Sequence, residues 1–362
     1  LYNNKIMTKK SVFILAIFLF CSWNIVVAQK FQSENLFYVT NSQSGIKSFQ
    51  DHASQISIIV PASYNIDQYG VIAGEVDSQV LIIANQNKVK VMPIVASFDQ
   101  KGIHHLLNDS DAIQRAIQMM VEIGKANHFY GWQFDFENIS FLDATAYTNF
   151  YQKAANALHE NGLKISMAIV KAYYSYPAPG DPAYNRWIYE NWKGAFQIKK
   201  LADIGDFISF MTYDEHTALT PPGPVAGLPW MNQMAQYLEN IHVPMDKVSF
   251  GIPTYSDHWF PTWDETQGAH STRSEISYQS AERLLEKNHA VLHWMPDQGV
   301  AYAYWAMPNG VFNWLFLEDA RSFTEKLKLI PKYGFRGISV WLLGEEDTGI
   351  WKILNENTEA TH

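Results

Sequence analysis

The chain has 362 residues, of which 47% are apolar and 14% aromatic, and its formal net charge is −9. This composition excludes an intrinsically disordered protein and supports one large globular domain. The acidic balance argues against nucleic acid and anionic membrane surfaces as partners, and it is easier to reconcile with a neutral or amphiphilic substrate.

Residues 1–28 look like a secretory signal. Lys9 and Lys10 precede an apolar run, and the small residue Ala28 would end a cleavage site. The run is shorter than the roughly 20 residues of a membrane span, although a retained anchor stays an alternative. Cys21, the only cysteine, lies in this segment, so the mature chain is expected to lack disulfides. We therefore expect a monomer secreted to the periplasm or the medium, without membrane attachment after cleavage.

Eight short runs rich in β-branched and apolar residues follow, and helix-period segments lie between most of them. The expected strands are 36–40, 56–61, 89–96, 131–136, 163–170, 206–213, 248–255 and 337–343. The clearest helices are 111–126 and 145–162, and the second ends at a glycine suited to a helix C-terminus. Alternation of strand and helix over about 300 residues predicts an α/β chain folded as a (β/α)8 TIM barrel over 29–362.

The spacing departs from regularity between the seventh and eighth expected strands, where residues 256–335 intervene. This interval contains a predicted helix at 277–290 and a second at 320–334. Between the two helices lie three short aromatic runs, 291–295, 301–307 and 312–316, separated by turn signals. We predict that a small α+β insertion occupies this position in the barrel.

The fourth expected strand, in the stretch GWQFDFEN, carries an unusual polar row. Bulky apolar residues alternate there with Gln133, Asp135 and Glu137, so one row should face the helices and the other the barrel interior. Catalytic groups of such barrels project from the C-terminal ends of the strands. Two carboxylates on one face repel, and the raised pKa that results suits a general acid at neutral pH. The row therefore predicts an acid–base pair, with a solvated strand face and a divalent metal site as alternatives.

The same stretch resembles a known family. YGWQFDFE is similar to the strand-4 signature of glycoside hydrolase family 18, Asp-x-x-Asp-x-Asp-x-Glu, and is closest to the spore-germination, cortex-lytic N-acetylglucosaminidase branch. FMTYDEH at 210–216, FGIPTY at 250–255 and GISVWLLGEED at 337–347 match further segments in the family's order. The chain departs from the pattern at Tyr130 and Gln133, which stand where the family has carboxylates.

The resemblance implies a chitinase-like glycosidase that cleaves β-1,4 linkages at N-acetylglucosamine with retention, through a substrate-assisted oxazolinium intermediate and without metal or cofactor. Peptidoglycan-type glycan, chitin oligomers and the N-glycan core are the implied substrates. Carried over by position, Glu137 is the general acid and base, and Asp135 orients the N-acetyl group. Tyr213 would hydrogen-bond the carbonyl of that group, Asp214 would contact the sugar, and Trp341 would form the floor under it.

Several other residues are weaker candidates. Met211 precedes the strand-6 tyrosine on the same face and should line the pocket, whereas Tyr255 could line it or simply pack at the rim. Gln133 can hydrogen-bond Asp135 but cannot share a proton with it as a carboxylic acid can. Five tryptophans in loop-like stretches could line a sugar cleft, although most should be packing residues: Trp187, Trp192, Trp230, Trp259 and Trp263.

Two acidic segments and two other functions stay open as alternatives. Asp214-Glu215-His216 invites a metal site, but adjacent strand residues point to opposite faces. The acidic segment 344–347 is better interpreted as a hydrogen-bonded loop with acids near a helix N-terminus. A non-catalytic carbohydrate-binding lectin could use the same barrel, and a metal-dependent hydrolase could act through the two carboxylates of the fourth strand. Retention of Glu137 favours the enzyme.

Overall fold

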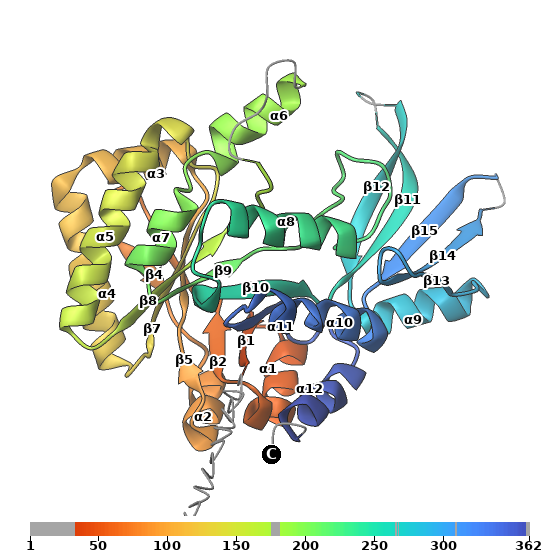
Figure 1. Cartoon of the computed structure of the whole chain (residues 1–362), viewed down its shortest axis with the longest axis horizontal. Helices are drawn as coiled ribbons and strands as arrows, with labels where there is room; N and C mark the ends of the chain where they lie inside the picture. Colours follow the sequence, from red (N-terminus) through yellow and green to blue (C-terminus); the bar gives the residue numbers. More distant parts are fainter. Residues whose placement is uncertain (1–32, 175–181, 265, 267, 308–309, 360–362) are drawn as a thin grey trace, which may run out of the picture. The chain divides into compact units, whose positions relative to one another are not determined.

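The structure is a computed structural model, and it describes residues 33–174, 182–264, 266, 268–307 and 310–359 (Figure 1). The expected signal at 1–28, with Cys21, lies outside these residues. Among the described residues, no helix combines the length and the apolar character needed to span a bilayer.

Within the described residues, eight parallel strand positions form the central sheet (Figure 1). They are β1 (Glu34–Val39), β2 (Ile58–Pro61), β5 (Lys90–Val91) continued by β6 (Ile94–Ser97), β7 (Gly131–Phe136), β8 (Lys164–Ile169), β9 (Phe207–Phe210), β10 (Val248–Pro253) and β16 (Gly337–Trp341). A short antiparallel hairpin, β3 (Tyr64–Ile66) and β4 (Ile72–Gly74), follows β2 and joins the sheet through β6. The sequence did not predict this hairpin.

The third expected strand closes the sheet into a barrel. It is interrupted at Met92 and Pro93, because proline has no N–H to donate to a sheet ladder. The part before the interruption pairs with β2 and the part after it with β7. Across the gap, Met92 N donates to Ile59 O and Gln133 N donates to Pro93 O. One continuous run therefore joins both edges, and the predicted (β/α)8 barrel is confirmed.

Helices follow most barrel strands, and Figure 1 shows α3, α4, α5 and α7 together on the outer side of β7 and β8. The helices around the barrel are α1 (Gln43–His52), α2 (Ser78–Asn87), α3 (Gln100–Asn108), α4 (Ser110–Ala126), α5 (Ala144–Glu160), α6 (Ala183–Ile188), α7 (Ile198–Ile204), α8 (Leu228–Asn240), α10 (Ala320–Leu327), α11 (Leu329–Tyr333) and α12 (Gly349–Glu359). A π-helical turn, Tyr189–Lys193, continues α6. The predicted helix at 320–334 is divided into α10 and α11, because Pro331 cannot donate the helical hydrogen bond across the break.

The apolar row of β7 packs against the helix layer, as its alternation predicted. Trp132 Nε1 donates to the carbonyl of Met120 in α4 at 2.9 Å. Phe134 and Phe136 are fully buried, and both contact Phe150 of α5 at ring-centroid distances of 5.5 and 6.3 Å. Because alternate residues of a strand point to opposite faces, packing of the apolar row against the helices makes the polar row of β7 face the barrel interior.

A second sheet lies between β10 and β16 in the sequence. Its order is β12 (Gly268–Ile276), β11 (Ser256–Asp264), β15 (Phe312–Leu317), β14 (Val300–Ala306) and β13 (His293–Met295), and α9 (Tyr278–Lys287) packs on it. The three aromatic runs correspond to β13, β14 and β15. The hairpin of β11 and β12 is longer than any of them and was not predicted, because β12 is largely polar and lacks an apolar alternation.

Candidate active site

A cavity of about 240 Å³ lies at the C-terminal ends of the barrel strands. Most of its lining comes from the ends of barrel strands, and two residues come from outside the barrel, Trp192 in the π-helical turn and Glu275 in β12. The side chains that line it are Tyr38, Ile94, Asp135, Glu137, Ala168, Val170, Lys171, Trp192, Met211, Tyr213, Asp214, Tyr255, Glu275 and Trp341.

The sequence-predicted site residues meet at this cavity with one exception. Seven of them line it: Asp135, Glu137, Met211, Tyr213, Asp214, Tyr255 and Trp341. Gln133 is buried below the cavity, where its Nε2 donates to Ser166 Oγ at 3.0 Å and to Ser209 Oγ at 3.1 Å. The contact expected between Gln133 and Asp135 is not formed, because the hydroxyls of the two neighbouring strands take both donated hydrogen bonds of the amide.

Asp135 and Glu137 are held in an environment that favours their protonated forms. Asp135 Oδ1 is buried without a hydrogen-bond partner. Burial, reinforced by the charge of Glu137, raises the pKa of Asp135 to about 7. Burial likewise raises the pKa of Glu137, and a 2.7 Å hydrogen bond from Trp192 Nε1 to its Oε2 opposes this rise. Both carboxyls therefore keep a proton at higher pH than an ordinary carboxyl does.

The backbone at the end of β7 fixes the position of Glu137. Its N–H donates to Ser97 O at 3.0 Å, which keeps it in register with β6. Asn138 then takes the left-handed conformation with φ 59°, and its Nδ2 donates to Phe98 O at 3.1 Å. Asparagine tolerates this region better than most residues, so the strand can end directly behind the carboxylate.

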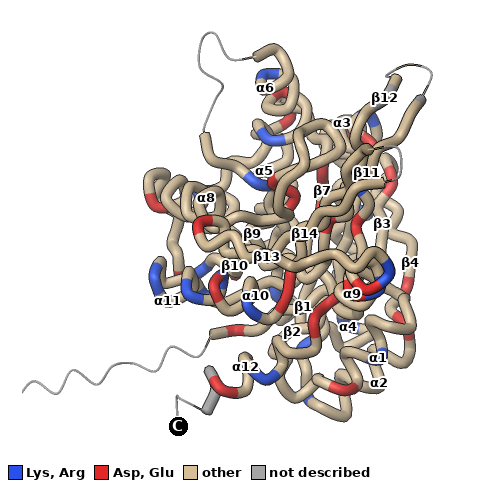
Figure 2. Tube along the Cα trace, turned by 90° about the vertical axis from the view of Figure 1, so that its right-hand side faces the viewer, with Lys and Arg blue, Asp and Glu red and all other residues tan. Residues whose placement is uncertain are grey.

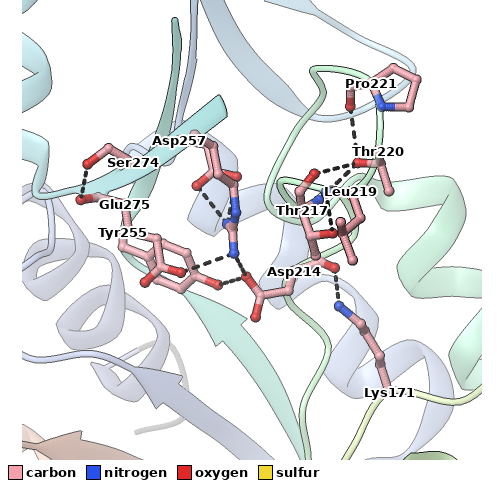
Figure 3. Close-up of polar contacts among 11 residues, drawn as sticks. Lys171, Asp214, Thr217, Leu219, Thr220, Pro221, Tyr255, Asp257, Ser274 and Glu275 are labelled. Carbon is pink, nitrogen blue, oxygen red and sulfur yellow. Dashed lines mark hydrogen bonds and ion pairs between the residues drawn. The ribbon is translucent and has the colours of Figure 1, made fainter. Parts of the chain in front are cut away.

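Asp214 sits in a charged network on another side of the cavity. Its Oδ1 accepts from Tyr255 Oη at 2.9 Å and from Arg273 Nη2 at 2.8 Å. Arg273 Nη1 contacts both oxygens of the fully buried Asp257 at 2.9 and 3.0 Å, and Arg273 Nη2 also reaches Glu275 at 3.1 Å. Figure 3 shows Tyr255 and Lys171 on opposite sides of Asp214. One guanidinium of the second sheet thus binds three carboxylates and links the hairpin of β11 and β12 to the barrel.

Burial also shapes the titration of this network. It raises the pKa of Asp257 to about 7, although the adjacent Arg273 opposes the shift. Burial alone would lower the pKa of Arg273, but the carboxylates outweigh it and raise this pKa, so the guanidinium stays charged. Asp214 has φ 60°, which turns the chain out of β9 at the point where the network holds its side chain.

Aromatic rings form the apolar part of the cavity. Trp341 and Tyr38 are in contact with ring centroids 5.3 Å apart and planes tilted by 58°. Tyr213 and Tyr255 meet edge to face at 6.4 Å. Burial raises the pKa of Tyr213 well above its ordinary value, so its hydroxyl stays a hydrogen-bond donor.

The residues of the proposed metal site at 214–216 point to separate partners. Glu215 Oε2 accepts from Gly227 N at 2.7 Å, and His216 Nδ1 contacts Pro221 O at 3.0 Å. Across the residues that the structure describes, no group of three or more His, Cys, Asp or Glu side chains could hold a metal ion. Asp214 therefore belongs to the network around Arg273, and Glu215 and His216 hold the loop that leads to α8.

The acidic segment after β16 is a hydrogen-bonded loop, as expected. Asp347 Oδ2 accepts from the backbone N–H of Ala320, the first residue of α10, at 2.8 Å, and its Oδ1 accepts from Gly349 N at 2.8 Å. Gly344 N donates to Glu346 Oε2 at 2.6 Å. Asp347 thus satisfies N–H donors at the starts of α10 and α12, Glu346 closes the loop itself, and both lie outside the cavity lining.

The sequence missed five polar or aromatic residues of the site: Tyr38, Lys171, Trp192, Arg273 and Glu275. Lys171 follows β8 directly, so the rule that found Asp135 at a strand end could have found it too. Trp192 was one of five candidate tryptophans without a distinguishing feature. Arg273 and Glu275 lie on a strand that was not predicted, and no local signal connects them to the barrel mouth.

Most of the chain is similar to proteins of one family. The model for "Glycosyl hydrolases family 18" matches residues 34–346. The uncharacterized glycosylase YvbX of Bacillus subtilis (strain 168) is 24% identical over 329 residues, which cover 89% of this chain and 90% of YvbX. The cortical fragment-lytic enzyme of the same organism is 25% identical over 299 residues, or 81% of this chain and 66% of the enzyme.

Solved structures show the same fold. The spore cortex-lytic enzyme SleL of Bacillus megaterium QM B1551 superposes with a TM-score of 0.78 at 22% identity, over 90% of this chain and 74% of SleL. A chitinase from Chromobacterium violaceum ATCC 12472 gives a TM-score of 0.76 at 22% identity, over 90% of this chain and 99% of the chitinase. The family match over most of the barrel, with the paired carboxyls of β7 at its mouth, shows that the chain belongs to glycosyl hydrolases family 18 and is a glycoside hydrolase.

Proposed function

We propose that this glycoside hydrolase cleaves β-1,4 linkages at N-acetylglucosamine with retention, by substrate-assisted catalysis. The observation that carries the proposal is the pair of protonatable carboxyls at the end of β7, which share one aromatic-walled cavity with Tyr213. Peptidoglycan-type glycan is the first substrate to test, because several similar proteins are described as cortical fragment-lytic enzymes.

Glu137 is assigned the proton transfers. Its raised pKa keeps a proton on the carboxyl, which it gives to the glycosidic oxygen as the bond from that oxygen to the anomeric carbon breaks. The carbonyl oxygen of the substrate's own N-acetyl group attacks the anomeric carbon and forms a cyclic oxazolinium ion. The carboxylate of Glu137 then removes a proton from water. The water oxygen attacks the anomeric carbon from the face that the leaving group occupied, and the bond from this carbon to the acetamide oxygen breaks. Two inversions give net retention.

Asp135 is assigned the charge stabilisation. The oxazolinium ion is a cation, and Asp135 Oδ1 is a buried acceptor without a hydrogen-bond partner among the described residues. A carboxylate in such a water-poor site stabilises a nearby cation more strongly than one in water does. Because the pKa of Asp135 is about 7, a substantial fraction of this carboxyl is already ionised at neutral pH before the reaction starts, and a nearby cation favours that ionised form.

The remaining lining fits an N-acetylated sugar. Tyr213 keeps its phenolic proton and can donate it to the acetamide carbonyl. Trp341 and Tyr38 present an aromatic surface on which the C–H face of a pyranose ring can pack. Asp214, anchored by Tyr255 and Arg273, can accept from a sugar hydroxyl with the oxygen that these partners leave free.

Product analysis tests the proposal directly. The protein is incubated with chitooligosaccharides, peptidoglycan and a high-mannose glycopeptide, and the products are identified by mass and anomeric configuration. Glu137→Gln is expected to reduce turnover by about 10²–10⁴-fold, because it removes the transferable proton. Glu160→Gln, at the exposed end of α5, is the matched control and should leave turnover unchanged.

The alternatives give different results. A lectin would bind these glycans without releasing products, and a metal-dependent hydrolase would lose its activity in chelator. Inhibition by a thiazoline mimic of the oxazolinium ion supports the substrate-assisted route. Release of products from none of the three glycans would overturn the proposal.

Export is proposed together with this activity, because residues 1–28 have the charge and apolar pattern of a secretory signal. Expression of the full sequence in a bacterium should yield a periplasmic or medium fraction whose N-terminus is Gln29. An intact N-terminus in the membrane fraction would show a retained anchor instead. Light scattering of the exported protein tests the expected monomer.

A further inference from the structure

Two lysines flank the tryptophan that hydrogen-bonds the general acid. Lys171 lines the cavity at the end of β8, and its Nζ lies 5.6 Å from the ring centroid of Trp192. Lys193 follows Trp192, and its Nζ lies 5.8 Å from the same ring. Because Trp192 Nε1 donates to Glu137, the ring that both ammonium groups approach also contacts the residue assigned to the proton transfers.

Among the described residues, the two ammonium groups lack the acidic partners that some other lysines have. Lys47, Lys199 and Lys328 each pair with a carboxylate at 2.6–2.7 Å, and basic and acidic positions lie side by side along α9 (Figure 2). In the part of the chain that the structure describes, neither Lys171 nor Lys193 forms an ion pair with a side-chain carboxylate.

The surroundings of Lys193 are cationic and aromatic. Its Nζ lies over the rings of Tyr173 and Tyr174 at 5.2 and 5.8 Å, besides that of Trp192. Aromatic faces attract an ammonium group but do not neutralise it. Burial, together with the charge of Lys171, lowers the pKa of Lys193 to about 8. The charge of Lys193 is therefore held in place by rings, and no carboxylate among the described residues pairs with it.

Lys171 has a different balance of charges. Burial lowers its pKa to about 8, while the carboxylates of Asp214, Glu137 and Glu215 oppose that shift and Arg273 adds to it. Its Nζ donates to the backbone carbonyl of Asp214 (Figure 3). Lys171 therefore lies among the carboxylates of the cavity. Lys193, by contrast, has no carboxylate partner within the part of the chain that the structure describes.

We propose that Lys193, with Lys171, binds a carboxylate of the substrate, so that the preferred glycan carries an acidic sugar next to the N-acetylglucosamine unit. This inference rests on the proposed function and deepens it from any N-acetylglucosamine polymer to an anionic one. A substrate carboxylate within reach of the two ammonium groups would form charge-assisted hydrogen bonds. Such bonds are stronger than hydrogen bonds between neutral groups.

The same chemistry is found in two kinds of glycan. In peptidoglycan the carboxylate belongs to a lactyl ether on the sugar that alternates with N-acetylglucosamine. In uronate-containing glycans it belongs directly to the alternating sugar ring. Chitin oligomers offer no carboxylate and are the neutral reference.

The experiment compares each acidic glycan with its own uncharged copy. Peptide-free peptidoglycan strands and hyaluronan oligosaccharides are cleaved before and after chemical reduction of their carboxyl groups to primary alcohols, and kcat/KM is measured for each form at pH 6.5. One hydrogen-bonded charge pair predicts that reduction lowers kcat/KM by about tenfold to a hundredfold on the preferred glycan. The glycan whose cleavage falls on reduction is the kind of acidic glycan that the site recognises.

Substitution of Lys193 assigns the preference to this residue. Lys193→Met keeps the apolar stem and should bring the ratio of kcat/KM for the acidic and reduced forms close to one. Lys193→Arg keeps the charge and should retain most of that ratio. Lys153→Met, on the exposed face of α5, is the matched control and should leave the ratio as in the wild type.

The results separate the inference from the proposed function. Equal cleavage of acidic and reduced glycans, with normal cleavage of chitooligosaccharides, would overturn the anion site and leave the hydrolase. A preference for acidic glycans that persists in Lys193→Met would overturn the role of Lys193. Failure of the wild type on every glycan would overturn the proposed function itself.

Discussion

Two walls of the cavity are built in opposite ways. The wall of β7 places Asp135 and Glu137 through the period of a single strand, with its apolar partners packed on α4 and α5. The wall of the second sheet places Asp214 through Arg273, which is 59 residues away in the sequence. The β7 wall needs only local regularity, whereas the wall around Asp214 needs two sheets to meet.

The electrostatics of the two walls differ in the same way. The carboxyls of β7 lack a basic side chain in direct contact, so burial and mutual repulsion raise the pKa of Asp135. At the other wall the guanidinium of Arg273 binds three carboxylates and compensates the buried Asp257. The carboxyls assigned to the reaction thus have no ion pair in direct contact among the described residues, whereas the carboxylates that join the second sheet to the barrel are paired with Arg273.

Among the variants that compare the two walls, the largest change in activity is expected for Asp135→Asn. It removes the charge that stabilises the cationic intermediate, so kcat should fall by about 10²–10³-fold. Steady-state kinetics on a chitooligosaccharide measures this loss. A fall of less than threefold would contradict the assignment of the β7 wall to the chemistry.

The same variant should be more stable than the wild type above neutral pH. The folded-state pKa of Asp135, about 7, lies above that of an unfolded chain, so the folded protein binds more protons and its stability falls as pH rises between the two pKa values. Asparagine cannot ionise and avoids this loss. The difference in Tm between Asp135→Asn and the wild type should therefore increase from pH 4 to pH 8, and a constant difference would contradict the raised pKa.

A large loss of stability is expected when Arg273 is removed. Arg273→Met leaves Asp257 buried without its partner, which costs about 3–5 kcal/mol when a buried pair is broken. The double variant Arg273→Met with Asp257→Asn removes the unpaired charge and should recover most of that loss. Urea unfolding measures both. If the double variant is as unstable as the single one, the pairing with Asp257 is not what holds this wall.

A change in pH dependence is expected for Trp192→Phe. The indole N–H lowers the pKa of Glu137, so its loss lets the pKa rise further. Because the acid must carry a proton, activity disappears as pH rises through this pKa, and the alkaline limb of the kcat/KM profile should move to higher pH. A limb that stays in place, with normal folding, would contradict the control of Glu137 by Trp192.

The smallest effect is expected at the end of β7. Asn138→Ala forces alanine into the left-handed region and should cost about 1–2 kcal/mol of stability. Asn138→Gly adopts this conformation freely and should cost less, although it also lacks the hydrogen bond to Phe98. Thermal unfolding compares the two, and equal losses would show that the side-chain bond matters more than the backbone.

Much of the β7 wall could be predicted from the sequence because each of its determinants is local. The alternation of GWQFDFEN shows which side chains share a face, and the order of strands and helices shows where that face points. The interruption of the third strand also had a local signal in Pro93. The hydrogen bond that the sequence allowed between Gln133 and Asp135 does not form. The hydroxyls that accept from Gln133 come from Ser166 and Ser209 on two other strands, which no local pattern reveals.

The sequence by itself determined the barrel, the row of Asp135 and Glu137 and the resemblance to family 18, because periodicity and motif order are properties of short segments. Only the tertiary structure decided that Trp192 hydrogen-bonds Glu137, that Lys171 and Lys193 both approach the ring of Trp192, and that a polar hairpin brings Arg273 to Asp214. Polar side chains have no period that reveals their partners. Their contacts are fixed by how distant strands and loops pack, and the cavity is where those distant segments meet.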